Sequence, residues 1–375
     1  MDLSLIREDI DKVDKEIIEL FQKRMDLCEE VAKYKLSVGK AILDKGREDS
    51  KIEKVQTFVD DESMKVALSD LFRQIMSSSR KLQYKFMEQN SATVRAECEI
   101  VDKIETQGAK VCYQGIEGAY SYLAMKRYFG EDVDGYNVPT FDAAMKEVAE
   151  GRADFAVLPI ENSTAGIVND TYDLLMKYDN YIVADLVYEI DHALLGLPGA
   201  KVSDISKVYS HPQGLMQCSH YLDEHLDWDR IATTNTSLGA KKVLSDGDIH
   251  QAAIASREAA KVFGLEVIAS EIRNEKNNAT RFVIISKKRS FAKDAKTMSI
   301  CFEIAHEAGS LYGILSHIKY NGLNMTKIQS RPIEGKMWQW RFYVDFEGNV
   351  NDAAVLNAMR GIEAESTYLK FLGNY

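Results

Sequence analysis

The stretch Ile6–Leu27, IREDIDKVDKEIIELFQKRMDL, decides the first part of the fold. Its apolar residues recur at alternating spacings of three and four positions: Ile6, Ile10, Val13, Ile17 and Leu20. Side chains with this spacing lie on one face of an α-helix. Before residue 108 the only glycines are Gly39 and Gly46, and there is no proline. We therefore expect a helix over 3–37, a break at 39–43 and two further helices through residue 86.

Polar residues recur on the same helices. Arg24 and Lys35 are 11 residues apart, which at about 100° per residue aligns them within about 20° on one helix. Later helices add polar residues at spacings of three and four: Asp44, Arg47 and Glu48, and then Ser79 and Gln83. A single charge on such a stripe usually belongs to a solvated face, but the combination is harder to explain in that way.

From Lys110 to about Lys288, short β-rich runs alternate with amphipathic helical stretches. The runs are Lys110–Tyr113, Phe155–Leu158, Lys207–Tyr209, Ala252–Ala255 and Phe282–Ile285. This order predicts an α/β domain with a largely parallel sheet. A polar stretch over 87–110 is interpreted as a linker from the helical segment.

Four polar clusters lie near these strands, where open α/β sheets place their ligands. They are Gly115–Ser121 (GIEGAYS), Pro159–Gly166 (PIENSTAG), Ser210–Gln213 followed by Gln217 and Cys218, and Asn278–Phe282 (NATRF). The first is equally well explained as a plain glycine turn or as an anion-binding helix N-terminus. The second has more polar residues than one helix cap needs. Cys218 and His220 are interpreted as structural, and no G-x-S-x-G motif occurs.

The tail, residues 297–375, has the order strand, helix, strand, strand, helix and a possible last strand. This β-α-β-β-α-β order predicts a ferredoxin-like fold. That fold hosts many functions, so it indicates none by itself.

Composition limits the remaining possibilities. The chain has 375 residues, which predicts two or three domains, and 47 basic against 58 acidic residues, a net charge of −11 that argues against nucleic-acid binding. No apolar run approaches the ~20 residues that span a bilayer. The acidic N-terminus is unlike a signal peptide. Five scattered cysteines without C-x-x-C or H-E-x-x-H spacing support neither disulfides nor a metal site. We expect a cytoplasmic protein.

Residues 1–90 resemble the all-helical chorismate mutases that are fused to prephenate dehydratase. The resemblance rests on Ile6–Leu27, on Lys33–Lys35 (KYK) and on Asp44–Glu48 (DKGRE). The implied substrate-binding residues are Arg7, Arg24, Asp44, Arg47 and Ser79, and the implied catalytic residues are Lys35, Glu48 and Gln83. Claisen rearrangement of chorismate is unimolecular, so fixed cations and donors around a dianion suit it.

The separation of Arg7 and Arg24 predicts the assembly. They are 17 residues apart, about 26 Å along one straight helix. One chorismate cannot bridge that gap. We therefore expect Arg7 to reach a partner's site in an obligate homodimer or a higher homo-oligomer.

Residues 108–288 resemble prephenate dehydratase through the G-x-x-G-A-Y-S, P-I-E-N-S, S-H-P-Q and T-R-F motifs. The resemblance implies two lobes of the periplasmic-binding-protein type, with prephenate in the cleft and no cofactor. The implied catalytic residues are Thr280 and Glu161, and the implied substrate-binding residues are Ser121, Asn162, Ser163, Ser210, Gln217 and Arg281.

Residues 297–375 resemble the ACT domain that regulates these enzymes. Gly309, Ser310 and Leu311 resemble its G-A-L motif, and Gln329, Ser330, Arg331 and Pro332 resemble E-S-R-P with Gln in place of Glu. The resemblance implies that phenylalanine binds between paired domains as an effector. A dimerisation module without a ligand is the alternative.

Together these features predict a bifunctional enzyme of phenylalanine biosynthesis that converts chorismate to prephenate and prephenate to phenylpyruvate. One alternative is a dehydratase with a catalytically weak mutase domain that serves dimerisation or regulation. A non-catalytic solute-binding protein is a second alternative.

Overall fold

The computed structural model describes residues 2–90 and 98–375. It divides into two compact units, one built from residues 1–97 and 295–371, and the other from 98–294 and 372–375. The linker expected over 87–110 falls partly on 91–97, outside the described residues.

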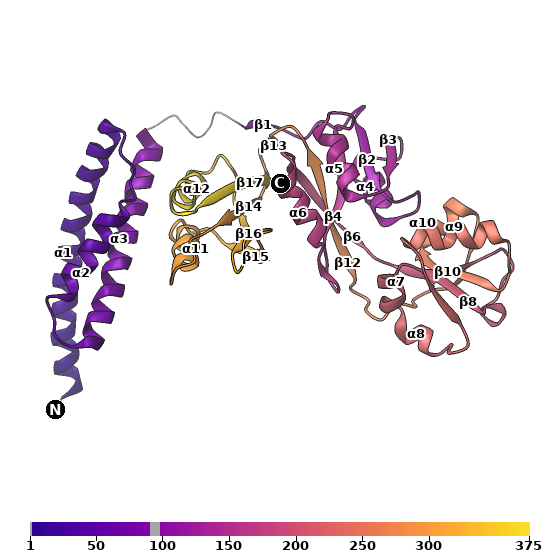
Figure 1. The fold of residues 1–375 in the computed structure, drawn as a ribbon, viewed down its shortest axis with the longest axis horizontal. Coiled ribbons are helices and arrows are strands. Elements are labelled where there is room, and N and C mark those ends of the chain that lie inside the picture. Colours follow the sequence, from indigo (N-terminus) through magenta and orange to yellow (C-terminus); the bar gives the residue numbers. More distant parts are fainter. Residues whose placement is uncertain (1, 91–97) are drawn as a thin grey trace. The chain divides into compact units, whose positions relative to one another are not determined.

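Three helices form the N-terminal part of the first unit (Figure 1): α1 (Leu3–Val38), α2 (Lys45–Gln56) and α3 (Glu62–Asn90). Asp2 caps α1 by accepting a hydrogen bond from the Ser4 N–H at 3.0 Å. Gly39 ends it with a left-handed φ of 65°. Both α1 and α2 pack against α3. The predicted long helix, break and two further helices are confirmed.

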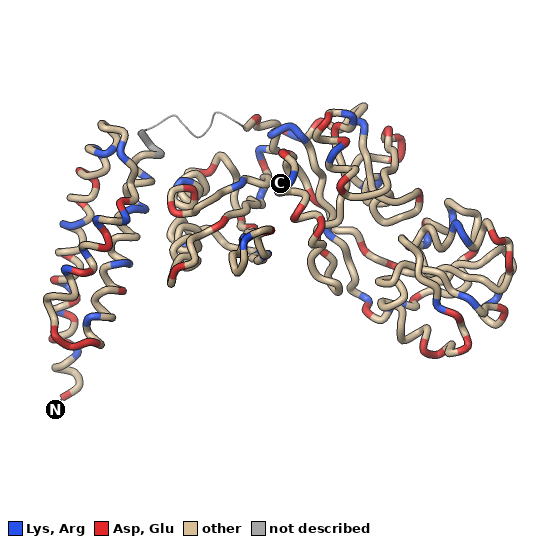
Figure 2. Tube along the Cα trace, in the orientation of Figure 1, with Lys and Arg blue, Asp and Glu red and all other residues tan. Residues whose placement is uncertain are grey.

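Charged residues of both signs are interspersed along these three helices (Figure 2). The first unit also holds the C-terminal segment: β14 (Thr297–Glu303), α11 (Ser310–Tyr320), β15 (Met325–Pro332), β16 (Trp340–Glu347), α12 (Ala353–Glu365) and the first half of β17 (Tyr368–Asn374), which ends in the second unit. β16 pairs antiparallel with β14 and β15. α11 and α12 pack together, and α12 also packs on α3. A core that includes Phe302, Ile314 and Phe346 joins sheet and helices.

The second unit contains two lobes, and the chain enters the second lobe after β6 and returns along β12. The first lobe consists of β2 (Lys110–Gln114), α4 (Tyr120–Phe129), β3 (Asp134–Val138), α5 (Phe141–Ala149), β4 (Phe155–Asn162), β5 (Gly166–Ile167), α6 (Asn169–Lys177), β6 (Tyr181–Glu189) and β12 (Ala279–Ser286). Its main strands follow the order β6-β12-β4-β2-β3. A small sheet pairs β1 (Glu99–Val101) with β13 (Ser290–Ala292).

The second lobe has a sheet of order β11-β7-β10-β8-β9. Its elements are β7 (His192–Gly196), the 3-10 turn η2 (Val202–Asp204), β8 (Lys207–Ser210), α7 (Pro212–Gln217), α8 (Ser219–Asp223), β9 (Asp229–Ala232), α9 (Thr236–Asp246), β10 (Gln251–Ser256), α10 (Arg257–Phe263) and β11 (Glu266–Ala269). Apolar residues fill both faces of this sheet.

The expectation of one largely parallel sheet is wrong. In the first lobe β2 pairs parallel with β3 and β4, but β12 pairs antiparallel with β4 and β6. In the second lobe β7 is likewise antiparallel to β10 and β11. The reason is topological, because strands that lead out of a lobe and back into it run in opposite directions.

Candidate functional site

Side chains from α1 and α3 meet at Arg24, Ser79 and Gln83. Arg24 Nη1 donates to Ser79 Oγ, which in turn donates to the Ile75 carbonyl at 2.9 Å. Gln83 is buried and donates from Nε2 to the Ser79 carbonyl at 3.2 Å. Its Oε1 is buried and has no hydrogen-bond partner among the described residues. Because buried polar atoms are normally paired, this oxygen marks a place where a ligand group can bind.

These residues form the helical site, and Lys35 lies on the same face of α1 as Arg24, about 16 Å further along the axis. Its Nζ donates to the Ile42 carbonyl at 2.5 Å, just before α2. Burial lowers the pKa of Lys35, the Asp44 carboxylate opposes that shift, and the Arg47 charge adds to it. Asp44 itself caps α2 by accepting from the Arg47 N–H at 3.1 Å. The structure therefore groups Lys35 with the residues that open α2.

Glu48 is held by Arg80, a residue that sequence reasoning missed. Arg80 Nη1 donates to both Glu48 carboxylate oxygens, at 2.7 Å to Oε1. Its Nε donates to Glu365 Oε1 at 2.7 Å, at the end of α12. The Arg80 side chain is 11% exposed. No local spacing could have identified it, because its partners lie 32 and 285 positions away.

Arg7 lies outside the helical site. It is exposed on α1, 17 residues before Arg24 on the same uninterrupted helix, which is about 26 Å along the axis. Within one chain the structure therefore does not bring Arg7 to Arg24.

A second group of polar side chains, the cleft site, involves both lobes of the second unit. The register pairs Thr280 on β12 with Asn162 on β4. Asn162 Nδ2 donates to Thr280 Oγ1 and to Asn278 Oδ1, both at 2.9 Å. From the second lobe, Gln217 Nε2 donates to Thr164 Oγ1 at 3.0 Å. Three predicted residues, Thr280, Asn162 and Gln217, are thus brought together.

A cavity of about 410 Å³ opens at this group. Apart from Ala165 and Met216, its lining residues are polar: Thr164, Gln213, Gln217, Asn274, Glu275 and Asn278. Among the residues that the structure describes, no Lys or Arg lines it. Hydrogen-bond donors rather than cations would therefore meet a bound anion here.

Arg281 and Glu161 lie elsewhere. Successive strand residues point to opposite faces, and the register pairs Arg281 with Glu161 and not with Asn162. Arg281 Nε donates to Asp185 Oδ2 at 2.6 Å, and the guanidinium lies 5.6 Å from the centre of the Tyr375 ring. The structure thus does not bring Arg281 and Glu161 to the face that carries Thr280. β12 begins at Ala279, so Thr280 lies inside the strand and not before it.

The predicted serines make structural contacts near the cleft site. Ser163 Oγ donates to the Asn277 carbonyl at 3.1 Å and accepts from the Ala279 N–H at 2.9 Å. These two bonds fix the backbone just before Thr280. Ser210 is fully buried, and its Oγ donates to the Ile254 carbonyl at 2.6 Å, tying β8 to β10. Ser121 is buried in the first turn of α4.

Sequence reasoning also missed His192. Its Nδ1 lies 3.1 Å from Tyr120 Oη, and its Nε2 lies 3.0 Å from Gln217 Oε1. Burial lowers the pKa of His192 to about 4, against the opposing hydrogen bond from Gln217. Tyr120 belongs to the Gly115–Ser121 cluster, but a histidine at the start of an apolar strand carries no comparable signal.

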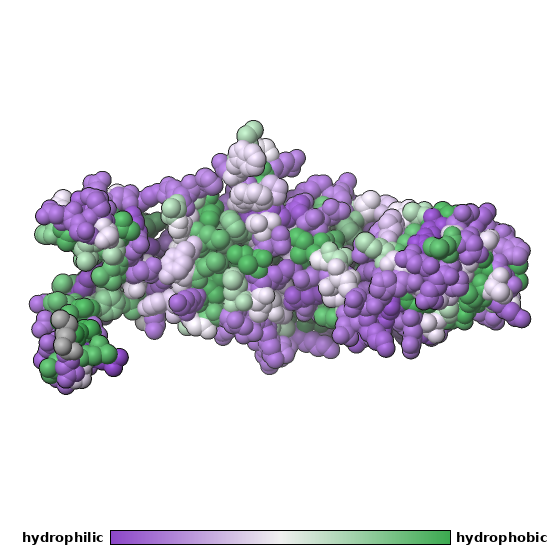
Figure 3. All heavy atoms as spheres, turned by 90° about the horizontal axis from the view of Figure 1, so that it is seen from below, coloured by the Kyte–Doolittle hydropathy of each residue, from purple (hydrophilic) through white to green (hydrophobic). Residues whose placement is uncertain are grey.

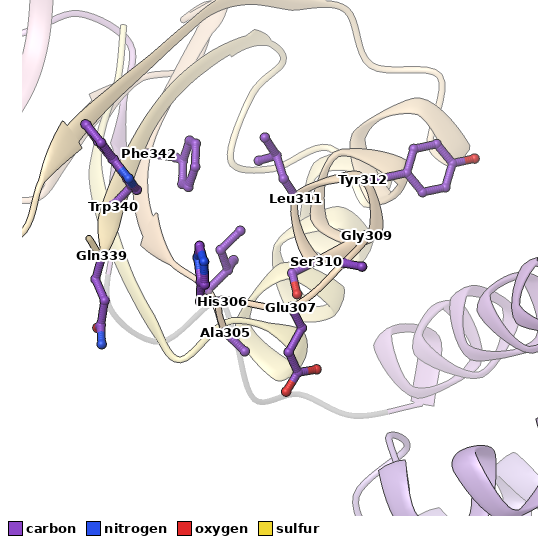
Figure 4. Close-up of a pocket in the computed structure, with 12 residues that line it drawn as sticks. Ala305, His306, Glu307, Gly309, Ser310, Leu311, Tyr312, Gln339, Trp340 and Phe342 are labelled. Atoms are coloured by element: carbon purple, nitrogen blue, oxygen red, sulfur yellow. The ribbon is translucent and has the colours of Figure 1, made fainter. Parts of the chain in front are cut away.

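The C-terminal segment has its own cavity of about 490 Å³ (Figure 4). Gly309, Ser310 and Leu311 line it from the start of α11, and His306, Trp340 and Phe342 line it from other elements. In Figure 4 the Tyr312 side chain points away from Phe342 and Trp340. Gln329–Pro332 lies on β15 and does not line this cavity, and Gln329 Nε2 donates to the Ser330 carbonyl at 3.1 Å.

No group of three or more His, Cys, Asp or Glu in residues 2–90 and 98–375 could hold a metal ion. Within those same ranges, every helix is too short or too polar to cross a membrane.

Known families match both units. Residues 6–84 match the family model of chorismate mutase type II, and residues 111–290 match that of prephenate dehydratase. The bifunctional chorismate mutase/prephenate dehydratase of Escherichia coli (strain K12) is 31% identical over 380 residues, covering 100% of this chain and 96% of that protein.

Solved structures match 71% of the chain. Prephenate dehydratase from Arthrobacter aurescens, in complex with L-Phe, is 27% identical with a TM-score of 0.66, and 89% of it is covered. GqqA, described as a novel type of quorum quenching acylase, is 29% identical with a TM-score of 0.65, and 97% of it is covered.

Proposed function

The chain belongs to the bifunctional chorismate mutase/prephenate dehydratase family, and from this premise we propose that the helical site and the cleft site carry its two reactions. The enzyme rearranges chorismate to prephenate and converts prephenate to phenylpyruvate in phenylalanine biosynthesis. The observation that supports the assignment is that each candidate group gathers residues from separate elements: Arg24, Ser79 and Gln83 in one, with Lys35 further along α1, and Asn162, Gln217 and Thr280 in the other.

In the mutase reaction one C–O bond breaks while a C–C bond forms, without a covalent enzyme intermediate. The protein must hold a dianion in a compact conformer and stabilise negative charge on the ether oxygen. Arg24 would bind a carboxylate, and Arg47 would support it. Lys35 would donate to the ether oxygen. Gln83 would also face it, and because one N–H of its Nε2 is used by the Ser79 carbonyl, the second N–H would be the donor. Asp44, Glu48 and Ser79 would meet the hydroxyl and the ring.

In the dehydratase reaction prephenate loses CO2, and its ring hydroxyl leaves as water after gaining a proton. The ring becomes aromatic, so the substrate itself supplies the driving force. The protein needs a donor at the leaving hydroxyl and donors at the carboxylates. Thr280 would donate to the hydroxyl, and Asn162 would orient Thr280 through the bond of 2.9 Å. Ser121, Ser163, Ser210 and Gln217 would shape the pocket.

The proposed roles of Glu161 in catalysis and of Arg281 in carboxylate binding require a change from the arrangement in this structure. Arg281 would bind a carboxylate only if it left Asp185, to which it donates at 2.6 Å. A conservative change, Arg281→Lys, distinguishes the two roles. A change confined to the KM for prephenate would support substrate binding, whereas loss of stability alone would support a structural ion pair.

The direct test is to add chorismate to the purified chain and to follow prephenate and phenylpyruvate separately. Lys35→Ala should lower mutase turnover by about a hundredfold or more and leave dehydration unchanged. Thr280→Val should lower dehydratase turnover by about 10²–10⁴ and leave the mutase unchanged. Thr280→Ser keeps the hydroxyl and is the matched control. Loss of both activities from either change, in folded protein, would contradict the assignment.

We further propose a homodimer or a higher homo-oligomer. The apolar stripe of α1 supports it, because Ile10, Ile17 and Leu20 are 52–67% exposed and hydrophobic atoms reach the surface in Figure 3. A partner helix would cover this stripe. It would also bring the partner's own Arg7 to the helical site and so complete it.

The C-terminal segment is proposed to be a ferredoxin-like ACT domain that binds phenylalanine. The support is the cavity at Gly309–Leu311 and the L-Phe bound by the Arthrobacter dehydratase. Gln329–Pro332 of a paired domain would close the site. The proposed location is the cytoplasm, which the five free cysteines suit.

A further inference from the structure

A continuous run of hydrogen bonds crosses the cleft of the second unit. It passes through Tyr120, His192, Gln217, Thr164, Asn162 and Thr280. Each of its five links is between 2.8 and 3.1 Å. Because the donors and acceptors along it depend on one another, one unambiguous link sets the direction of all the others.

The hydrogen bonds of Asn162 are the unambiguous ones. Its Oδ1 accepts from the backbone N–H groups of Thr164 and Ala165, at 3.0 and 2.8 Å. Backbone N–H groups only donate, so this end of the amide must be the oxygen. The NH2 end then donates to Thr280 Oγ1. The hydroxyl hydrogen of Thr280 is therefore left to donate to another group.

The direction continues into the second lobe. Thr164 Oγ1 donates to Asn162 Oδ1 at 2.8 Å and must accept from Gln217 Nε2. Gln217 Oε1 consequently faces His192 Nε2, which must carry a hydrogen. A neutral imidazole then has a bare Nδ1, which accepts from the Tyr120 hydroxyl. Burial, which lowers the pKa of His192 to about 4, keeps the ring neutral at pH 7.

The result is a cavity that presents donors. Gln217 Nε2 faces Thr164, which lines the cavity. Asn278 is buried and lines it too; its Oδ1 accepts from Asn162, and its Nδ2 has no partner among the described residues. A substrate with two carboxylates needs donors; in the described part of the chain no Lys or Arg lines this cavity, and one carboxylate, that of Glu275, does, so the amide donors must outweigh it.

We propose that His192 is a positioning residue for the dehydratase reaction: as the Nε2–H tautomer, whose bare Nδ1 accepts from Tyr120, it binds the Gln217 oxygen and so keeps the Gln217 NH2 turned toward the cavity and prephenate. His192 itself is 2% exposed and does not touch the substrate. Asn278 Nδ2 is a second donor to the same dianion. The inference rests on the proposed assignment of the cleft site to the dehydratase.

The test is steady-state dehydratase kinetics of the full chain with prephenate as the substrate. His192→Phe removes both ring nitrogens and should raise the KM about tenfold, with a smaller change in kcat. His192→Gln can donate from its amide where Nε2 does, so it should recover most of the affinity. Gln217→Glu places an acceptor where the donor was and should bind prephenate more weakly than Gln217→Ala. The surface variant His220→Phe is the matched control.

A double-mutant comparison of His192 and Gln217 distinguishes a positioning role of His192 from a purely structural one. In a Gln217→Ala background, His192→Phe should add no further rise in KM, because the donor that it orients is gone. An unchanged KM in His192→Phe, or the full rise repeated in that background, would overturn the inference. If His192→Phe fails to fold, Tyr120→Phe tests the same link with packing kept, and the KM should again rise. If Thr280→Val leaves dehydratase activity unchanged, the assignment of the cleft site to the dehydratase is wrong, whatever the His192 variants show.

Discussion

Arg80 is expected to be the main electrostatic link between the helical part and the C-terminal segment of the first unit. Its guanidinium, 11% exposed, serves the carboxylates of Glu48 and Glu365, which are 25% and 11% exposed. His317 Nε2 lies 3.1 Å from the same Glu365 carboxylate. Arg80→Met keeps the aliphatic volume and removes the charge, so both carboxylates lose their shared partner.

The burial of these groups sets the size of the effect. Breaking a buried ion pair by removing one partner costs about 3–5 kcal/mol, because a charge remains buried without compensation. Glu48 is a quarter exposed and can turn to water, and Glu365 keeps His317 nearby. We therefore expect about 2–3 kcal/mol for Arg80→Met. Because about 1.4 kcal/mol changes an equilibrium constant tenfold, local opening should become about 30- to 160-fold more frequent.

Hydrogen exchange measured by mass spectrometry reports that opening segment by segment. Peptides from α3 and α12 should exchange faster in Arg80→Met, whereas peptides from β10 in the other unit should not change. Lys45→Met is the matched control, because the Lys45–Glu307 pair also joins the two parts but is 62% and 56% exposed. The double variant Arg80→Met with Glu365→Gln should open no more often than Arg80→Met alone. Unchanged exchange of α12 in Arg80→Met would refute the reasoning.

Three further outcomes are expected. Mixing Arg7→Ala chains with Arg24→Ala chains should restore mutase activity, because each heterodimer regains one intact site; verified heterodimers without activity would argue against shared sites. Gln329→Glu should bind phenylalanine more tightly in calorimetry, because a carboxylate makes a charge-assisted bond to the ammonium group; equal affinities would show that Gln329 does not meet it. Folding lowers the pKa of His192 from 6.5 to about 4, so the unfolded chain binds the proton first as the pH falls. Up to about 3 kcal/mol of the free energy of unfolding should therefore be lost between pH 6.5 and pH 4. Urea unfolding of His192→Phe should lack that part of the pH dependence.

The helices and the two reactions could be read from the chain because their signals are local. A three-and-four spacing needs only the 3.6-residue period of the helix, and α1 follows it from Leu3 to Val38. The prephenate dehydratase motifs likewise named Thr280, Asn162 and Gln217 before their contacts were known. The family comparison confirms both activities.

The boundary of β12 was harder to predict. Two of its first residues, Thr280 and Arg281, are polar, and polar residues hide the apolar pattern of a strand. The alternation of side chains along that strand then turns Arg281 away from Thr280. A motif that lists both residues together does not reveal this difference in direction.

From the sequence alone, the helices, the two activities and the motifs that carry Asn162, Gln217 and Thr280 could be predicted, because each signal depends on spacing along a few turns or on one strand end. Only the tertiary structure decided that Arg80 joins Glu48 to Glu365 and that His192 orients Gln217. These pairs are separated by 32, 285 and 25 positions. The contribution of each pair to stability or to the site depends on its burial and on which end of an amide or imidazole faces its neighbour. Those quantities exist only once distant segments have packed together and excluded water.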